Sequence, residues 1–406
     1  MLYKLFQKKV FHIEPGLERI KKACEELGNP QNDFPSILIS GTNGKGSTSA
    51  YLESLLRYHG FRTGMFTSPH LVEENERWQI NRENIPDKIL EEYIKGLKPI
   101  IQKHNLTYFE ASTLLAFKYF SDQKVDIAVL EVGLGGRWDS TNIVEPELSV
   151  ITNVSLDHTH LLGDSIQKIA FEKVGISRKN KPLIIGSPQK EIKEEALKKG
   201  VKEIYQFKKD FDFKMKGQKM DYHFDIYDLK NLNPSLIGKR QFNNLATALT
   251  AFIVFAEKEM IPLSFSNIRE AVSNTRWQGR MQILSKDPFI ILDGAHNEDA
   301  IKKTYEEIKE LFPEKEIITI YSGMKDKNIE EILKLISKNS KKVFVSKIPV
   351  SRSLTEEDLE PTGLNFEYIP DIEKSISKAK SELIENQIIL ITGSLYLAGE
   401  VLKQKI

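Results

Sequence analysis

The segment of residues 36–60 constrains the fold of this chain more than any other. It begins with a short apolar run, residues 36–39, suited to a buried strand, and it ends in a pattern that puts three leucines on one face of a helix. Between them lies a glycine-rich turn with Lys45. The turn predicts a phosphate-binding loop, because glycines bring backbone N–H groups close to a phosphate while the helix N-terminus and the lysine add positive charge. A tight turn with a surface lysine is the alternative.

The loop departs from the common pattern G-x-x-x-x-G-K-[ST] at both ends. Ile39 stands where the first glycine belongs, and Gly46 stands where the hydroxyl residue belongs. Hydroxyls follow one and two positions later. We therefore expect a nucleotide-binding loop of another subclass. Its candidate contact residues are Thr42, Asn43, Gly44, Lys45, Gly46, Ser47 and Thr48.

Composition argues against several classes of protein. The chain has 406 residues, 40% of them hydrophobic, and a formal net charge of +1. At about 100–200 residues per domain this predicts two or three domains, and the near-neutral charge gives no reason to expect nucleic acid as a partner. The single cysteine, Cys24, cannot form an internal disulfide, which favours a reducing compartment. Without a signal-like start or an apolar run of about 18 residues, we expect a cytoplasmic protein that does not cross a membrane.

Apolar runs alternate with amphipathic segments along most of the chain. One series of expected strands covers residues 37–39, 126–131, 148–152 and 182–186, and a second covers 289–292, 317–321, 343–345 and 388–391. Strands that alternate with helices predict an α/β fold with parallel sheets covered by helices. We expect a P-loop ATPase-like parallel-sheet domain at residues 1–284 and a smaller, Rossmann-like α/β domain at residues 285–406.

Two further segments carry local predictions. Residues 207–231 alternate polar and apolar side chains around a central glycine, which predicts an antiparallel hairpin inserted late in the first domain. The polar bend at residues 285–288 is interpreted as a linker between the two domains.

Polar residues that follow the expected strands are candidates for binding, because ligands gather at the carboxyl ends of parallel strands. Glu131 ends one apolar run, and a buried carboxylate is costly unless it is paired or binds a metal. Beside a phosphate loop it indicates Mg²⁺, which keeps waters and phosphate oxygens as ligands. An ion pair with Lys45 is the alternative. His158 and His160 are two positions apart, and we do not expect them to share one metal.

Other candidates keep two interpretations open. Lys173 lies near the end of a predicted helix at residues 166–176, where a solvated surface lysine is ordinary. A buried lysine near a metal could instead be carbamylated, which would make it a two-oxygen ligand. In the second half, Asp293 and His296 follow one expected strand and Ser394 follows another. Asp293 could bind a ribose or an ammonium group, or these residues could be turn and cap residues.

A series of motifs now resembles one known family over nearly the whole chain. The motifs are GTNGKGST, FTSPHL, ERWQIN, LTYFEASTLLAF, EVGLGGRWDSTN, LDHTHLLG, IAFEKVGI, WQGRMQ, DGAHN, MKDKNI and TGSLYLAGEV. In order and spacing they resemble the folylpolyglutamate synthases and bifunctional dihydrofolate synthases of the Mur ligase superfamily. Gly46, directly after the loop lysine, is typical of the folate-type members.

The resemblance implies an ATP-dependent, amide-forming ligase. The carboxylate of dihydropteroate or of a reduced folate would take the γ-phosphate of ATP, and the amine of L-glutamate would attack the resulting acyl phosphate. The implied cofactors are ATP and one or two Mg²⁺ ions, with a monovalent cation left open. The implied partners are small-molecule substrates only, and we expect a monomer, as most relatives are.

The resemblance also implies roles for individual residues. The catalytic residues would be Lys45, His158 and Lys173. The metal ligands would be Ser68, Glu131, His158 and carbamylated Lys173. Further ATP contacts would come from Asn244, Arg280 and Asp293. The substrate-binding residues would be Phe109, Glu110, Asp139, Ser140, Thr141, His296 and Ser394. Residues 16–19 match another pterin-side segment weakly.

Three positions depart from the common family pattern. Trp138 replaces a leucine beside the pterin-side segment, Arg82 replaces a glycine, and Arg240 replaces a histidine near the adenine contacts. Trp138 could alter the pterin pocket. Two other functions stay open: a folylpolyglutamate synthase without the dihydropteroate reaction, and a nucleotide-hydrolysing switch protein that needs no second substrate.

Overall fold

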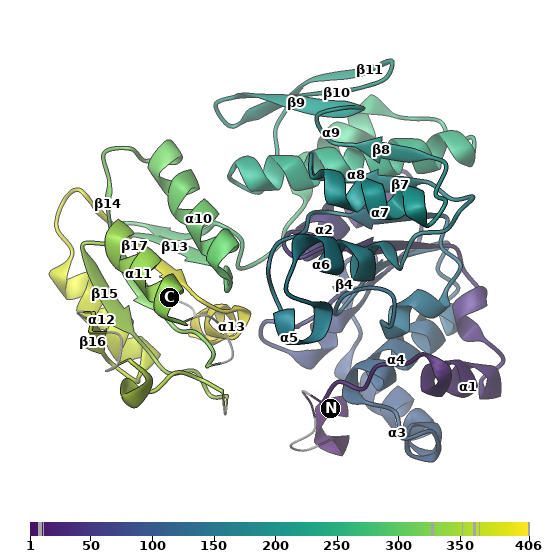
Figure 1. Ribbon diagram of the computed structural model, residues 1–406, viewed down its shortest axis with the longest axis horizontal. Helices are drawn as coiled ribbons and strands as arrows, with labels where there is room; N and C mark the ends of the chain where they lie inside the picture. Colours follow the sequence, from purple (N-terminus) through teal and green to yellow (C-terminus); the bar gives the residue numbers. More distant parts are fainter. Residues whose placement is uncertain are drawn as a thin grey trace. The chain divides into compact units, whose positions relative to one another are not determined.

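The computed structural model describes residues 1–6, 10, 12–325, 329–350, 352–359, 363–364 and 366–404. This described chain divides into two compact units. The first contains Met1–Ser235 and Arg240–Arg276, and the second contains Leu236–Lys239 and the residues from Trp277 onward. Each unit has its own sheet flanked by helices, so the predicted α/β fold class is confirmed (Figure 1).

The main sheet of the first unit has the strand order β4-β3-β2-β5-β1-β6-β7-β8. Its strands are β1 (Ser36–Ser40), β2 (Thr63–Phe66), β3 (Trp78–Ile80), β4 (Glu83–Asn84), β5 (Ile127–Glu131), β6 (Leu148–Ile151), β7 (Leu183–Ile185) and β8 (Ile204–Gln206). In this order, all neighbours from β2 through β5, β1, β6 and β7 to β8 pair in parallel, while β3 and β4 form an antiparallel edge. The central strands β1 and β5 are buried at every position, as continuous apolar runs predict.

Helices connect these strands. They are α1 (Glu18–Glu26), α2 (Lys45–Tyr58), α3 (Asp87–Lys103), α4 (Tyr108–Asp122), α5 (Thr159–Leu162), α6 (Ile166–Val174), α7 (Lys190–Lys198), α8 (Lys239–Lys258) and α9 (Phe265–Asn274). Short 3-10 helices lie at Leu2–Leu5, Pro30–Asn32, Glu74–Arg77 and Ser140–Ile143. Helix α4 begins where Thr107 and Glu110 cap each other, which satisfies N–H groups that have no partner within the helix.

The segment predicted as a hairpin is a meander of three strands within the described residues 207–232. These are β9 (Phe211–Lys216), β10 (Lys219–Phe224) and β11 (Tyr227–Leu232), which lie side by side in Figure 1. A second tight turn at Asp225, where φ is +49°, adds the extra strand. The predicted antiparallel hairpin around Gly217 is confirmed as β9 and β10, while β11 was not predicted because the second turn lacks the glycine that marks the first one.

The sheet of the second unit has the strand order β12-β13-β17-β14-β15-β16. Its strands are β12 (Gln282–Lys286), β13 (Phe289–Asp293), β14 (Glu316–Tyr321), β15 (Lys342–Val345), β16 (Glu367–Tyr368) and β17 (Gln387–Thr392). Its helices are α10 (Glu298–Leu311), α11 (Ile329–Asn339), α12 (Ile372–Glu382) and α13 (Leu395–Lys403), with a 3-10 helix at Glu356–Asp358. All pairs are parallel except β12 with β13.

The segment expected to link the domains is part of this second sheet. Residues 285–288 form the turn between β12 and β13, in which Lys286 pairs with Phe289. The expected boundary between residues 284 and 285 therefore falls inside β12, and the two units divide at Arg276 instead. Polar composition marked the turn correctly but could not distinguish a turn from a linker. Across the described residues, no helix has both the length and the apolar character needed to span a membrane.

Candidate functional site

The loop between β1 and α2 has a backbone that only glycine adopts easily. Gly44 precedes the first residue of α2 with φ +86°, in the left-handed region. A Cβ atom at Gly41 would lie 1.8 Å from Oγ1 of Thr152, and one at Gly44 would lie 2.4 Å from Oδ1 of Asn244. The loop thus packs directly on Asn244, a predicted ATP contact from a distant helix. That contact itself stays a prediction.

The polar groups of the loop suit an anion. The ammonium of Lys45 donates to the carbonyls of Gly41 at 3.1 Å and Thr42 at 3.4 Å. The hydroxyls of Ser47 and Thr48 are buried in the first turn of α2 and have no hydrogen-bond partner among the described residues. A buried hydroxyl without a partner is costly, so a phosphate oxygen or a phosphate-bound metal fits there. The loop therefore fits a nucleotide phosphate with Mg²⁺.

Residues after β6 hold the loop in shape, although they are not among the predicted site residues. The carbonyl of Asn43 accepts hydrogen bonds from Asn153 Nδ2 at 2.9 Å and Thr152 Oγ1 at 2.7 Å. The N–H of Ser155 donates to Oγ1 of Thr42 at 3.0 Å. Their position could have indicated this role, because they follow an expected strand directly and ligands gather at such strand ends.

Two of the predicted metal ligands meet at the end of the sheet. Glu131 closes β5 and is buried, and its Oε2 atom accepts a hydrogen bond from the N–H of Ser68 at 3.2 Å. Across the described residues, no three His, Cys, Asp or Glu side chains cluster closely enough to hold a metal by themselves. An Mg²⁺ ion that takes few protein ligands and several phosphate or water oxygens fits such a sparse set.

The two histidines that we did not expect to share one metal lie close together in the folded chain. His158 has φ +49° and stands before the first residue of α5, while His160 lies within that helix. Their ring centroids are 6.3 Å apart. The chain turns here instead of running extended, and it leaves the two rings close to each other. Whether either ring binds a metal stays a prediction.

Lys173 is buried in the last turn of α6, with 3% of its surface exposed. The interpretation as a solvated surface lysine is therefore wrong. Burial, followed by the positive charge of Lys45, lowers the pKa of Lys173 to about 7, against the opposing effect of Asp157 and Asp139. Much of this amine is neutral near pH 7, and its interaction with Lys45 puts it beside the phosphate loop.

The predicted pterin-side residues gather around α4 and the turn after β5. A Cβ atom at Gly133 would lie 2.5 Å from the ring of Phe109, so the two are in close contact. Ser140 and Thr113 share a hydrogen bond of 2.6 Å between their hydroxyls. The structure thus brings together two segments that are far apart in the sequence.

The two acids of this group bond to the chain itself. Glu110 accepts hydrogen bonds from Thr107 N–H at 2.8 Å and Arg19 Nε at 3.1 Å, which joins the weakly matched residues 16–19 to the group. Asp139 accepts from the N–H of Thr141 at 3.0 Å, and burial raises the pKa of its carboxyl. Both acids have structural partners, so their contact with a substrate stays a prediction.

In the second unit the predicted residues act as turn and cap residues. Asp293 accepts hydrogen bonds from Met281 N–H at 2.9 Å and Thr304 Oγ1 at 3.0 Å. Ser394 caps α13 by accepting from the N–H of Leu397 at 3.0 Å. The ring of His296 bonds to the carbonyl of Gly294, and a Cβ atom at Gly294 would lie 3.1 Å from Nη1 of Arg280. These four residues, Arg280, Asp293, His296 and Ser394, lie at the ends of neighbouring strands or beside them. Residues 326–328 of the MKDKNI motif lie outside the described residues.

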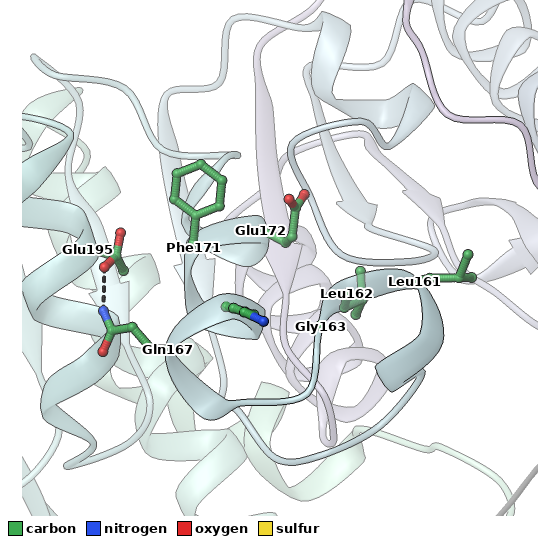
Figure 2. Close-up of a pocket in the computed structure, with 8 residues that line it drawn as sticks. Leu161, Leu162, Gly163, Gln167, Phe171, Glu172 and Glu195 are labelled. Carbon is green, nitrogen blue, oxygen red and sulfur yellow. Dashed lines mark hydrogen bonds between the residues drawn. The ribbon is translucent and has the colours of Figure 1, made fainter.

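A cavity of about 330 Å³ lies among α5, α6 and α7 (Figure 2). It is lined by Leu161, Leu162, Gly163, Gln167, Lys168, Phe171, Glu172 and Glu195. None of these is a predicted site residue, although Glu172 is the neighbour of Lys173 in the chain.

The structure also places the three residues that depart from the common family pattern. Trp138 is half-exposed, and Nη2 of Arg82 donates to the carbonyl of Arg276 at 2.5 Å. Arg240 lies in the first turn of α8.

The position of the loop defines the class of protein. It joins β1 to α2 in the central part of the sheet, where Glu131 ends β5 and His158 follows β6, the two strands that flank β1. This is the arrangement of a P-loop nucleotide-binding α/β protein.

Comparison with known proteins narrows this class. Residues 39–252 match the Mur ligase middle domain, and residues 279–395 match the Mur ligase, glutamate ligase domain. The dihydrofolate synthase/folylpolyglutamate synthase of Bacillus subtilis is 31% identical over 97% of this chain and 96% of its own. The folylpolyglutamate synthase of Lacticaseibacillus casei is 33% identical over 94% and 92%. The chain therefore belongs to the Mur ligase family, among its dihydrofolate synthases and folylpolyglutamate synthases.

Solved structures agree with this assignment. The Escherichia coli FolC in complex with DHPP and ADP superimposes with a TM-score of 0.89, at 30% identity, over 99% of this chain and 95% of that one. A bifunctional folylpolyglutamate synthase/dihydrofolate synthase with Mn, AMPPNP and L-glutamate bound has a TM-score of 0.88, at 29% identity, over 99% and 97%. The resemblance indicated by the sequence motifs is confirmed.

Proposed function

We propose that this protein is an ATP-dependent ligase that adds L-glutamate to dihydropteroate, to reduced folates, or to both. The reaction proceeds through an acyl phosphate on the acceptor carboxylate. The observation that carries the proposal is the phosphate loop, in which Lys45 bonds only to loop carbonyls and the buried hydroxyls of Ser47 and Thr48 have no hydrogen-bond partner among the described residues. The names of relatives that match along most of their length indicate which acid and which amine are joined: dihydropteroate or a folate, and L-glutamate.

The residues of the site divide the chemical work between them. Lys45 binds the transferring phosphoryl group and stabilises its developing charge. Ser68, Glu131 and His158 would hold Mg²⁺, which supplies Lewis-acid charge to the phosphate oxygens when bound. Asn244, Arg280 and Asp293 would orient the nucleotide. Phe109, Asp139, Ser140 and Thr141 would line the pterin side, and His296 and Ser394 would contact L-glutamate.

Lys173 is proposed to be carbamylated. Carbon dioxide adds to a neutral amine, forming an N–C bond and releasing a proton, so the product is an anion with two oxygens. A lysine pKa of about 7 keeps much of the amine neutral at physiological pH, which supports this step. The anion would also replace the repulsion between Lys173 and the ammonium of Lys45 with attraction. A monovalent cation site, a monomeric state and a cytoplasmic location are further parts of the proposal.

A folylpolyglutamate synthase without the dihydropteroate reaction is the second candidate. The relative from Lacticaseibacillus casei, which carries only the folylpolyglutamate synthase name, supports it. Trp138 is the residue of this chain that bears on the choice, because its half-exposed indole stands directly before Asp139.

Mass spectrometry of the products tests the function. The purified protein is incubated with Mg-ATP and L-glutamate, with dihydropteroate in one tube and a tetrahydrofolate in another. We expect one added glutamate in both tubes, together with ADP and phosphate. Addition to the folate alone would select the second candidate. Phosphate release without acid or amine would instead support a nucleotide-hydrolysing switch and would contradict the ligase.

Replacing Glu131 with glutamine is expected to weaken the response to Mg²⁺. The amide oxygen can still accept the N–H of Ser68, but the negative charge is lost. The Mg²⁺ concentration at half-maximal rate should rise by about tenfold or more, which corresponds to about 1.4 kcal/mol. Glu74→Gln is a matched control, since Glu74 is also buried and accepts a backbone N–H, from Tyr3 at 2.8 Å. An unchanged Mg²⁺ titration in the Glu131 variant would make that residue structural only.

A further inference from the structure

The segment of residues 133–139, which we call the glycine segment, lies against the last turn of α6. A Cβ atom on Gly136 would come within 2.9 Å of the carbonyl oxygens of both Glu172 and Lys173. Backbone can approach backbone this closely because the position has no side chain. The end of α6, which carries Lys173, is therefore packed directly on the glycine segment.

Arg137 fastens this contact through its backbone and its side chain. Its N–H donates to the carbonyl of Glu172 at 2.9 Å. Its guanidinium donates two further hydrogen bonds to the carboxylate of Glu172, from Nη2 at 2.7 Å and from Nε at 3.3 Å. Asn142 Nδ2 donates to the carbonyls of both Arg137 and Gly175, each at 3.2 Å. A bidentate arginine–carboxylate pair fixes direction as well as distance.

Two aromatic rings add to the pair. The guanidinium carbon of Arg137 lies 4.9 Å from the ring centroid of Trp138 and 4.9 Å from that of Phe171. Figure 2 shows Phe171 and Glu172 standing next to each other on α6. Rings over a guanidinium attract it and displace water, so this pair is held more firmly than an isolated surface ion pair. Tryptophan is the strongest such partner, which gives Trp138 a physical role in this chain.

The other side of the glycine segment touches the rest of the site. The hydroxyl of Ser40, at the end of β1, donates to the carbonyl of Gly135 at 2.6 Å. Phe109 packs on Gly133. The segment therefore connects the phosphate-loop strand, the pterin-side helix and the helix that carries Lys173. A shift at its junction with α6 would move Lys173 relative to the other two.

We infer that Arg137 is a positioning residue: by holding Glu172, it fixes the last turn of α6 and the place of Lys173 beside the phosphate loop. The inference rests on the proposed function for what Lys173 does, while the Arg137–Glu172 pair is a matter of geometry alone. A clamp that only stabilises the fold is the competing explanation. If Arg137 positions Lys173, its removal should change turnover and the burial of Lys173 while the rest of the protein stays the same. If the pair only stabilises the fold, its removal should not act on Lys173 in particular.

A kinetic cycle separates the two explanations. Three variants are assayed for glutamate addition: Arg137→Ala, Glu172→Ala and the double variant. Lys181→Ala is the control, because it removes an ion pair of 2.7 Å, with Glu147, that includes no residue of α6. We expect kcat to fall on the order of tenfold to a hundredfold in each single variant, because small misplacements are costly in catalysis. The KM for ATP should stay within about twofold, and the double variant should be no worse than the singles. Additive losses would contradict coupling through the pair.

Lysine labelling gives a readout that needs no activity. The folded proteins are treated briefly with acetic anhydride, and the labelled peptides are quantified by mass spectrometry. Lys173 should react several-fold faster in Arg137→Ala than in the wild type, while Lys181 and the melting temperature change little. In Arg137→Lys, which keeps one charge contact, the labelling rate of Lys173 should lie between those of the wild type and Arg137→Ala. This variant replaces Arg137→Ala in the test if the alanine variant does not fold. Equal labelling of Lys173 in all variants, or faster labelling of every lysine, would overturn the inference. A wild type that transfers no glutamate would contradict the proposed function but leave this result standing.

Discussion

Replacing Lys45 with methionine should lower kcat for glutamate addition by about 10²–10³-fold, the usual cost of removing one electrostatic stabiliser of a transition state. The lysine begins α2, and its ammonium rests on the carbonyls of Gly41 and Thr42, where a phosphate oxygen can draw it away. Charge that develops on the transferring phosphoryl group would then have no ammonium beside it. The measurement is steady-state turnover with Mg-ATP, L-glutamate and the preferred folate acceptor.

The fold should survive this change, because methionine is a good helix former and is similar in length. Lys190→Met is the matched control, since Lys190 is also the first residue of its helix, α7, and is exposed. It should keep full activity. A second effect follows from the proximity of the two lysines: without the charge of Lys45, the pKa of Lys173 should move up toward its ordinary value. Wild-type turnover in the Lys45 variant would mean that the loop does not serve phosphoryl transfer.

Replacing Lys173 with alanine should reduce turnover by at least about 10²-fold, because the proposed carbamate ligand and its charge would be lost beside the proposed metal. Acetate or formate should restore part of the activity by entering the space of the carbamate. Ethylamine is the informative control, since it would restore an ammonium group but no anion. Rescue by the acids and not by the amine supports the carbamate. Full activity without any addition would remove Lys173 from the mechanism.

The pH dependence of the wild type follows from the same residue. Its pKa is lowered to about 7, so the neutral amine that reacts with carbon dioxide predominates above that pH and declines below it. Activity should therefore fall as the pH drops below 7, and bicarbonate added at low pH should restore part of it. A rate that rises under the same conditions would contradict a carbamate formed from this amine.

Much of the fold follows from hydrophobic periodicity. The central strands β1, β5 and β6 are short apolar runs between polar turns, so their places could be predicted closely. The extra strand β11 was missed because the turn at Asp225 reaches its left-handed backbone without a glycine. The hairpin at residues 285–288 was missed because polar composition is the same in a turn and in a linker.

The site was predictable in its motifs but less so in its contacts. The loop residues carry a local signal, and Lys45 was found from it alone. The packing of Asn244 on Gly44 joins residues two hundred positions apart, and no local pattern encodes such a pairing. The turn at His158 likewise depends on a left-handed backbone that few side chains indicate. Four predicted residues form hydrogen bonds within the protein: Glu110, Asp139, Asp293 and Ser394. The sequence alone could not distinguish such a structural role from contact with a ligand.

The hydrogen bonds from Thr152, Asn153 and Ser155 to the phosphate loop have a consequence for how ATP is received. They hold Thr42 and Asn43 in place through bonds within the protein itself. A loop that is already ordered loses little conformational entropy when its ligand arrives, so the phosphate contacts contribute to affinity with little offset. A loop held in one shape should also accept phosphate chains of other shapes less readily. We therefore expect preorganisation of the loop to contribute to both the strength and the selectivity of the proposed ATP binding.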